Sequence, residues 1–148
     1  MIAVSPLEYL GLAATAWFAG FFPLTEILVA VPVALATPLD VVSAVVWPVL
    51  GNVTPLFLIL GGHAGLRRRP RAARWLDRVR SARTERLLAR YGVWIVLVIT
   101  PFLGVWATAV AALIQGMNPR RLIAAASVSI TFYAVAIALV LTRFTGLG

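Results

Sequence analysis

The chain has 148 residues, 61% of them hydrophobic, and a mean hydropathy of +0.96, which together exclude an ordinary soluble domain. It has no cysteine and one histidine, so disulfides, thiolate catalysis and histidine metal clusters are not expected. The net charge of +8 comes from 13 basic residues, all arginine, against 5 acidic residues. Because no nucleophile–base pair, phosphate loop or metal-ligand spacing occurs, we expect a membrane protein that is not an enzyme and binds no cofactor or metal.

The first apolar segment is interrupted near its middle, at Pro23. Ser5 and Glu8 form a capping-box pattern at its start, and a second arm continues from about Thr25 to Ala36. Each arm is about 20 Å long as a helix, whereas the hydrocarbon core of a bilayer is about 30 Å thick. The two arms are therefore predicted to form a re-entrant hairpin with its tip near the middle of the membrane.

A second segment, residues 41–62, is long enough to span the membrane. Thr37 and Asp40 flank Pro38 in another capping-box pattern, which predicts that this helix begins at Pro38. Pro55, near the middle of the segment, predicts a kink or a break in the helix.

Residues 66–90 form a basic linker between the two halves of the chain and contain ten of the arginines. Such a run suits nucleic acid, but between two apolar segments it favours a cytoplasmic loop that contacts anionic lipid. An amphipathic helix on the inner leaflet is predicted from the apolar face Ala72, Trp75, Leu76, Val79 and Ala82. The predicted lipid-interface residues are Arg67, Arg68, Arg69, Arg71 and Trp75.

The second half of the chain repeats the pattern of the first. The apolar run that begins at Tyr91 is interrupted at Thr100–Gly104, and Asn118 precedes a last span over residues 122–142. Interrupted apolar segments at matching places in two halves are typical of transporter-type membrane sites.

The distribution of arginine predicts the topology. Residues 67–90 are expected in the cytoplasm and both termini outside, in the inner (plasma) membrane of a prokaryote. A re-entrant hairpin returns to its own side, so the two halves have opposite orientations. We therefore predict one all-α, multi-pass membrane domain over residues 1–148, with inverted repeats at 5–65 and 91–144 whose tips meet near the midplane.

Polar residues mark the first predicted tip. Glu26 is the acidic residue deep in an apolar run, so it is predicted to bind a proton or a solute, with helix capping as the alternative role. Thr25 is predicted either to hydrogen-bond a ligand or to cap its arm. Asn52 is predicted to contact a ligand or to link helices, and Gly61 with Gly65 predicts close helix packing.

The second predicted tip carries neutral residues. Thr100 has the same two alternative roles as Thr25. Gly104, at the second tip, is also predicted to be a substrate-binding or proton-binding residue. Trp106 is predicted to pack either on a solute or against the opposite hairpin. Four prolines are predicted to form tips and kinks: Pro23, Pro32, Pro55 and Pro101.

Four short motifs follow one another along the chain. They are Glu26–Pro32, Gly51–Pro55, Tyr91-Gly92 and Pro101–Trp106. Thr108 and Gly116-Met117 follow at the spacing of the same pattern. Over about residues 8–142 the chain resembles the family of putative small multi-drug export proteins, whose motifs read Glu-Leu-Arg-Gly-Ala-Ile-Pro, Gly-Asn-x-x-Pro, Tyr-Gly and Pro-Gly-Thr-Gly-Ala-Trp. That family is distantly similar to the DedA, or SNARE-associated, superfamily. The chain departs from the pattern at Leu28, where the family has Arg, and at Phe102-Leu103, where it has Gly-Thr.

The resemblance implies a small transporter of a small or amphipathic solute, with proton coupling at Glu26. One alternative, implied by the superfamily, is a flippase or scramblase for anionic polyprenyl-phosphate or phospholipid head groups. Another is a structural membrane module that transports nothing. The expected partners are membrane lipids of the anionic inner leaflet and a small or lipid-like substrate, without nucleic acid; a homodimer is left open.

Overall fold

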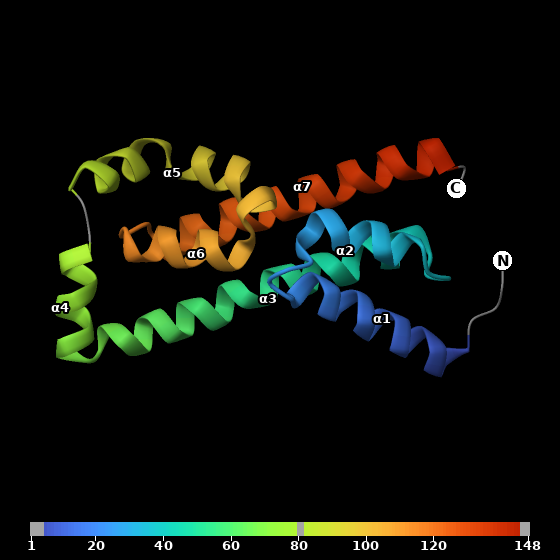
Figure 1. The fold of residues 1–148 in the computed structure, drawn as a ribbon, viewed down its shortest axis with the longest axis horizontal. Coiled ribbons are helices and arrows are strands. Elements are labelled where there is room, and N and C mark those ends of the chain that lie inside the picture. Colours follow the sequence, from blue (N-terminus) through green and yellow to red (C-terminus); the bar gives the residue numbers. More distant parts are fainter. Residues whose placement is uncertain (1–4, 80–81, 146–148) are drawn as a thin grey trace. The chain divides into compact units, whose positions relative to one another are not determined.

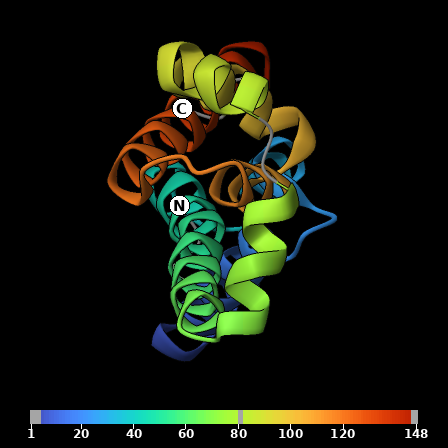
Figure 2. The same ribbon diagram turned by 90° about the vertical axis from the view of Figure 1, so that its left-hand side faces the viewer.

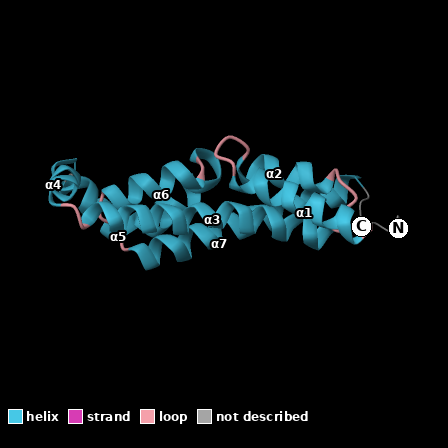
Figure 3. Cartoon of the chain, turned by 90° about the horizontal axis from the view of Figure 1, so that it is seen from below, coloured by secondary structure: helices cyan, strands magenta, loops and turns pink. Residues whose placement is uncertain are grey.

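The computed structural model describes residues 5–79 and 82–145, which form helices and short connections without a strand (Figures 1 and 3). The predicted all-α fold is confirmed. The two long apolar helices have 27 residues each and pass, by length and composition, as candidate membrane spans that contain the two predicted spans. The helices are α1 (Pro6–Phe21), α2 (Glu26–Leu35), α3 (Val41–Arg67), α4 (Pro70–Val79), α5 (Ala82–Leu103), α6 (Val105–Ile114) and α7 (Pro119–Thr145).

The helices divide into two compact units, each built around a hairpin of two helices. The first unit holds α1, α2, the part of α3 up to Thr54 and the part of α7 from Ile130. The second holds the rest of α3, then α4, α5, α6 and the start of α7 up to Ser129. Within their units, α1 packs on α2 and α5 packs on α6.

The predicted capping box at the start of α1 is confirmed. The Ser5 hydroxyl accepts the backbone N–H of Glu8 at 3.3 Å, and the Glu8 carboxylate accepts the backbone N–H of Ser5 at 2.9 Å. The helix ends before Phe22, which has the extended φ of −73° and ψ of 130° that a following proline favours. Pro23 therefore lies in the connection between α1 and α2.

The predicted start of α3 at Pro38 is wrong. The helix begins at Val41, and its cap is Asp40, whose carboxylate accepts the backbone N–H of Ser43 at 2.9 Å. Thr37 instead donates its hydroxyl to the carbonyl of Ala34 at 2.6 Å, which satisfies an acceptor left open at the end of α2. Helix α3 continues through Pro55 without a break.

Helix α1 and the first part of α3 run in the same direction and approach closely. Near their starts the hydroxyls of Tyr9 and Ser43 are 2.9 Å apart. Farther along, a Cβ atom added at Gly51 would collide with the backbone carbonyl of Trp17, and one added at Gly20 would collide with the backbone of α3. Because glycine lets helix backbones approach this closely, the two glycines fix the distance between α1 and α3.

The predicted close packing at Gly61 and Gly65 is not found. No heavy atom of the described structure lies within 4 Å of a Cβ added at either residue, beyond the immediate chain neighbours and the helix's own backbone. The small-residue pattern alone therefore indicated the wrong glycines, because packing also depends on which face of α3 meets another helix.

Alanines are frequent in the interiors of both units beside larger buried side chains such as Ile27, Leu113 and Leu122, and many other large apolar side chains face outward. Phe132, Leu139 and Trp94 remain 66%, 60% and 68% exposed, respectively. Large apolar surfaces of this kind suit contact with lipid rather than with water. Buried alanines of the first unit are Ala13, Ala16, Ala30, Ala34, Ala44, Ala134 and Ala138, and those of the second are Ala109, Ala112, Ala125 and Ala126.

Helix α4 follows α3 after a short turn and changes direction (Figure 2). The predicted helix in the basic linker is confirmed over residues 70–79, with Leu76 buried and Trp75 54% exposed. Arg67 and Asp77 form an ion pair at 3.4 Å, which joins the end of α3 to α4. Arg80 and the side chains of Ala72 and Val79 lie outside the described residues; contact of α4 with lipid stays a prediction.

Candidate functional site

The first helix break is the four-residue connection between α1 and α2. The hydroxyl of Thr25 donates to the backbone carbonyl of Ala19 and, at 3.3 Å, to that of Phe22. Ala19 lies in the last turn of α1 and Phe22 is its C-terminal cap, where the helix itself leaves acceptors open. Thr25 therefore closes the first arm, and it makes no side-chain capping bond to α2.

Glu26 is the first residue of α2 and has a backbone φ of +35°. Positive φ is uncommon outside glycine, and such strained positions concentrate at functional sites. The Glu26 carboxylate accepts a hydrogen bond from the side-chain amide of Asn52 on α3 at 3.4 Å. Asn52 is only 1% exposed, so the structure brings together an ionisable group and a buried amide that the sequence places 26 residues apart.

Leu28, at the position of the family arginine, lies on the outward face of α2. It is 37% exposed, whereas its neighbour Ile27 is buried. Pro32 lies inside α2, one turn farther along. A side chain at position 28 therefore lies at the surface and fills no buried space.

The second helix break lies at the last residue of the predicted interruption, Thr100–Gly104. Helix α5 continues to Leu103, and the chain turns at Gly104, which has a φ of 85° and a ψ of 153°. Only glycine adopts this backbone conformation without strain. The break therefore follows from the glycine, three residues after the proline.

Pro101 sits in the last turn of α5 because other groups replace its missing hydrogen bond. Proline has no N–H, so the carbonyl of Leu97 lacks its usual helical donor. The hydroxyl of Ser129 on α7 donates to that carbonyl at 2.7 Å, and Ser129 is only 1% exposed. The hydroxyl of Thr100 donates to the carbonyl of Val96 at 2.5 Å, so it too serves the backbone of the first arm.

Beyond the break, Trp106 is partly exposed near the start of α6. Thr108 lies within the same helix and is 6% exposed. Its hydroxyl has no hydrogen-bond partner within the part of the chain that the structure describes. An unsatisfied buried hydroxyl is costly, so Thr108 lowers the stability of this hairpin.

Of the six predicted substrate-binding or proton-binding residues, Thr25, Glu26 and Asn52 lie in the first unit, and the other three in the second. Sequence reasoning missed the role of Ser129. Ser127, Ser129 and Thr131 alternate along α7, and nothing in the sequence alone marks the middle one as the donor to Leu97.

A comparison with known protein families gives one match. Residues 26–137, from the strained glutamate to α7, match the family described as putative small multi-drug export proteins. No curated protein and no solved structure matches the chain. With its two long apolar helices and its exposed apolar side chains, the chain is a membrane protein, and it belongs to the family of putative small multi-drug export proteins.

Proposed function

We propose that this chain is a secondary transporter that moves a small or amphipathic solute across the membrane, as the export description of its family suggests. The observation that carries the proposal is the pairing of Glu26 with Asn52 at 3.4 Å beside the first helix break. An ionisable side chain among apolar helices is energetically costly and is by default a functional residue in a membrane protein. The positive φ of Glu26 supports the same conclusion.

The lengths of the first hairpin support a break inside the membrane. Helix α1 has 16 residues and α2 has 10, which correspond to about 24 Å and about 15 Å of rise against a hydrocarbon core of about 30 Å. We therefore propose a re-entrant hairpin, with residues 67–90 in the cytoplasm and both termini outside. The α5–α6 hairpin is proposed as its inverted counterpart.

Proton coupling is the proposed role of the Glu26 carboxyl group. When neutral, it leaves the positive end of α2 free to favour an anionic group. When ionised, it attracts a cation instead. We expect anion-headed amphiphiles to bind best, and better at acidic pH, whereas a cation preference that grows with pH would fit drug export driven by the ionised form.

Dye transport into proteoliposomes tests the proposal. The full chain is reconstituted, and uptake of ethidium (a cationic amphiphile) and of anilinonaphthalene sulfonate (an anionic one) is followed from mildly acidic to neutral pH. We expect Glu26→Gln to fold normally and to lose the pH dependence of uptake. Glu8→Gln, which removes an exposed capping carboxylate, is the matched control and should transport normally. Unchanged pH dependence in Glu26→Gln contradicts proton coupling through this residue.

The two alternative functions give different results in the same vesicles. A flippase would move a labelled anionic lipid between leaflets and leave the dyes untransported. A structural module would move neither dye nor lipid, although Glu26→Gln would still lower its thermal stability.

A further inference from the structure

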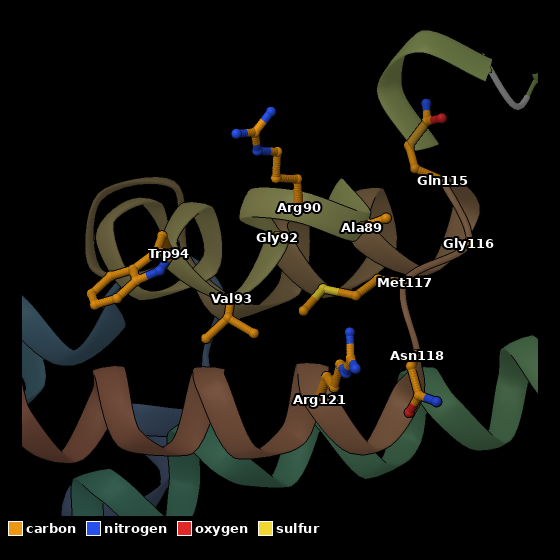
Figure 4. A pocket seen from close by; sticks show the side chains of 10 residues that line it. All are labelled: Ala89, Arg90, Gly92, Val93, Trp94, Gln115, Gly116, Met117, Asn118 and Arg121. Atoms are coloured by element: carbon orange, nitrogen blue, oxygen red, sulfur yellow. The ribbon is translucent and has the colours of Figure 1, made fainter. Parts of the chain in front are cut away.

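A pocket of about 400 Å³ lies in the second unit, where α5, the α6–α7 connection and the first turn of α7 meet (Figure 4). Three parts of the chain line it: α5 through Ala89, Arg90, Gly92, Val93 and Trp94, the connection through Gln115–Asn118, and α7 through Arg121. The family match assigns no function to this pocket, and the proposed role of Glu26 does not involve it.

One wall of the pocket is held in place by its own hydrogen bonds. The N–H of Gly116 donates to the carbonyl of Leu113 at 3.0 Å, and the N–H of Met117 donates to that of Ala112 at 2.9 Å. This is the Schellman arrangement, and it requires the positive φ of 89° at Gly116. Asn118 then caps α7 by accepting a backbone N–H of its first turn at 2.9 Å. The connection is thus preformed before any ligand arrives.

The charged groups of the pocket are both cations. Arg90 and Arg121 are exposed, and no acidic residue occurs among the described residues that line the pocket. Figure 4 shows Arg121 rising from α7 toward Met117, while Arg90 leaves α5 on the side away from α7. The Arg90 guanidinium lies 5.2 Å from the ring centre of Tyr91. Guanidinium groups match the geometry of phosphate oxygens and bind them through paired hydrogen bonds.

The remaining wall is apolar and exposed. Val93, Trp94 and Met117 line it, and Trp94 is 68% exposed. The pocket borders the first turn of α7, a candidate membrane span, which is the level at which tryptophan side chains gather in membrane proteins. A ligand that fits this lining carries an anionic group and an apolar part next to each other.

We propose that this pocket binds the phosphate group of an anionic membrane lipid, held by Arg121 and flanked by Trp94, with Arg90 as a second positive charge at the margin. Basic pockets between membrane helices are suited to anionic head groups. Soluble phosphate shares this chemistry and is the alternative source of the ligand. The site does not involve Glu26, so binding here is independent of the transport proposed above.

Quenching by brominated lipid tests the site. The full chain is reconstituted in phosphatidylcholine vesicles with a rising share of brominated phosphatidylglycerol, and the signal of Trp94 is taken as the difference between the wild type and Trp94→Phe. We expect preferential quenching by phosphatidylglycerol over brominated phosphatidylcholine. Arg121→Gln should lower this preference about fivefold and Arg90→Gln should lower it less, whereas Arg121→Lys should keep most of it.

Arg120→Gln is the matched control, because Arg120 neighbours Arg121 on α7, is exposed and does not line the pocket. An unchanged preference in Arg120→Gln supports the site. An equal loss in Arg120→Gln and Arg121→Gln would overturn it, since general surface charge would then explain the binding. The absence of any wild-type preference for phosphatidylglycerol would overturn it as well. Displacement of the brominated lipid by millimolar inorganic phosphate would assign the site to soluble phosphate and overturn the lipid source.

Discussion

The two hairpins interrupt their helices in different ways. Between α1 and α2 the break takes four residues and is followed by a glutamate at positive φ, whereas between α5 and α6 it is the single residue Gly104. Threonine hydroxyls satisfy backbone carbonyls beside both breaks, from Thr25 in the first hairpin and Thr100 in the second. In both hairpins a threonine side chain thus donates to backbone carbonyl groups at or near the end of the first helix. The first break differs in that an ionisable group, Glu26, lies next to a buried amide, Asn52.

The largest expected effect is at Gly51, where the first unit depends on close contact between α1 and α3. Gly51→Ala should destabilise the protein by about 3 kcal/mol or more, because the added methyl group collides with the backbone of α1. Thermal unfolding in detergent measures the change. Gly61→Ala is the control, since its Cβ meets open space and alanine favours the helix by up to about 1 kcal/mol. Equal stabilities of the two variants would contradict the close approach.

Gly104→Ala tests the second break. Alanine at φ 85° and ψ 153° should cost about 1–3 kcal/mol, because that conformation is nearly exclusive to glycine. The same substitution at Gly11, which lies within α1 and meets nothing within 4 Å, should be neutral or stabilising. A neutral Gly104→Ala would show that α5 and α6 join in another way. The unfolding midpoints of the two variants decide between these results.

A double-mutant cycle tests the pairing of Ser129 with the carbonyl that Pro101 leaves open. Ser129→Ala should cost about 1 kcal/mol in the wild type, because a hydrogen bond inside a membrane protein is lost. In a Pro101→Ala background the restored N–H satisfies the carbonyl of Leu97, so Ser129→Ala should cost less. An identical cost in both backgrounds would exclude the proposed compensation. Denaturant unfolding of the four proteins provides the cycle.

The smallest expected effect is a difference between the caps of α3 and α7 in how their contribution to stability depends on pH. The hydrogen bonds from the side chain and backbone of Ser43 hold the pKa of Asp40 below its ordinary value of 3.8. A carboxyl group with a lowered pKa in the folded state contributes stability above its unfolded pKa and loses it as pH falls through the folded pKa. Asp40→Asn should keep the cap and flatten the stability profile below about pH 4. Asn118→Ala should lower stability equally at all pH values; a pH-dependent loss there would contradict the comparison.

The helices could largely be predicted from the sequence because their signals are local. The capping box at Ser5, the cap at Asn118 and the apolar lengths of α3 and α7 each depend on neighbouring residues. The start of α3 was misplaced because Thr37 and Asp40 both precede a helix pattern, and only the hydrogen bonds show which one caps. The second break lies at the end of the predicted interruption and not at Pro101, since a proline near a helix end is tolerated once another group meets the open carbonyl.

The candidate site could be predicted only in part. The sequence singled out Glu26 and Asn52 separately, through an acidic and an amide side chain within apolar runs. Their contact depends on the close approach of α1 and α3 at Gly20 and Gly51, which is a tertiary property that no local pattern encodes. Ser129 was missed for the same reason, because its acceptor lies 32 residues away.

The central claim is that the Glu26 carboxyl takes part in solute binding at the first break. Infrared difference spectra of the reconstituted protein, recorded on addition of whichever dye is transported, follow the carboxyl groups directly. A solute-induced change in a carboxyl band is expected in the wild type and in Glu8→Gln, and its loss is expected in Glu26→Gln. A band that persists in Glu26→Gln, or the absence of any carboxyl change while the wild type binds the dye, would contradict the claim.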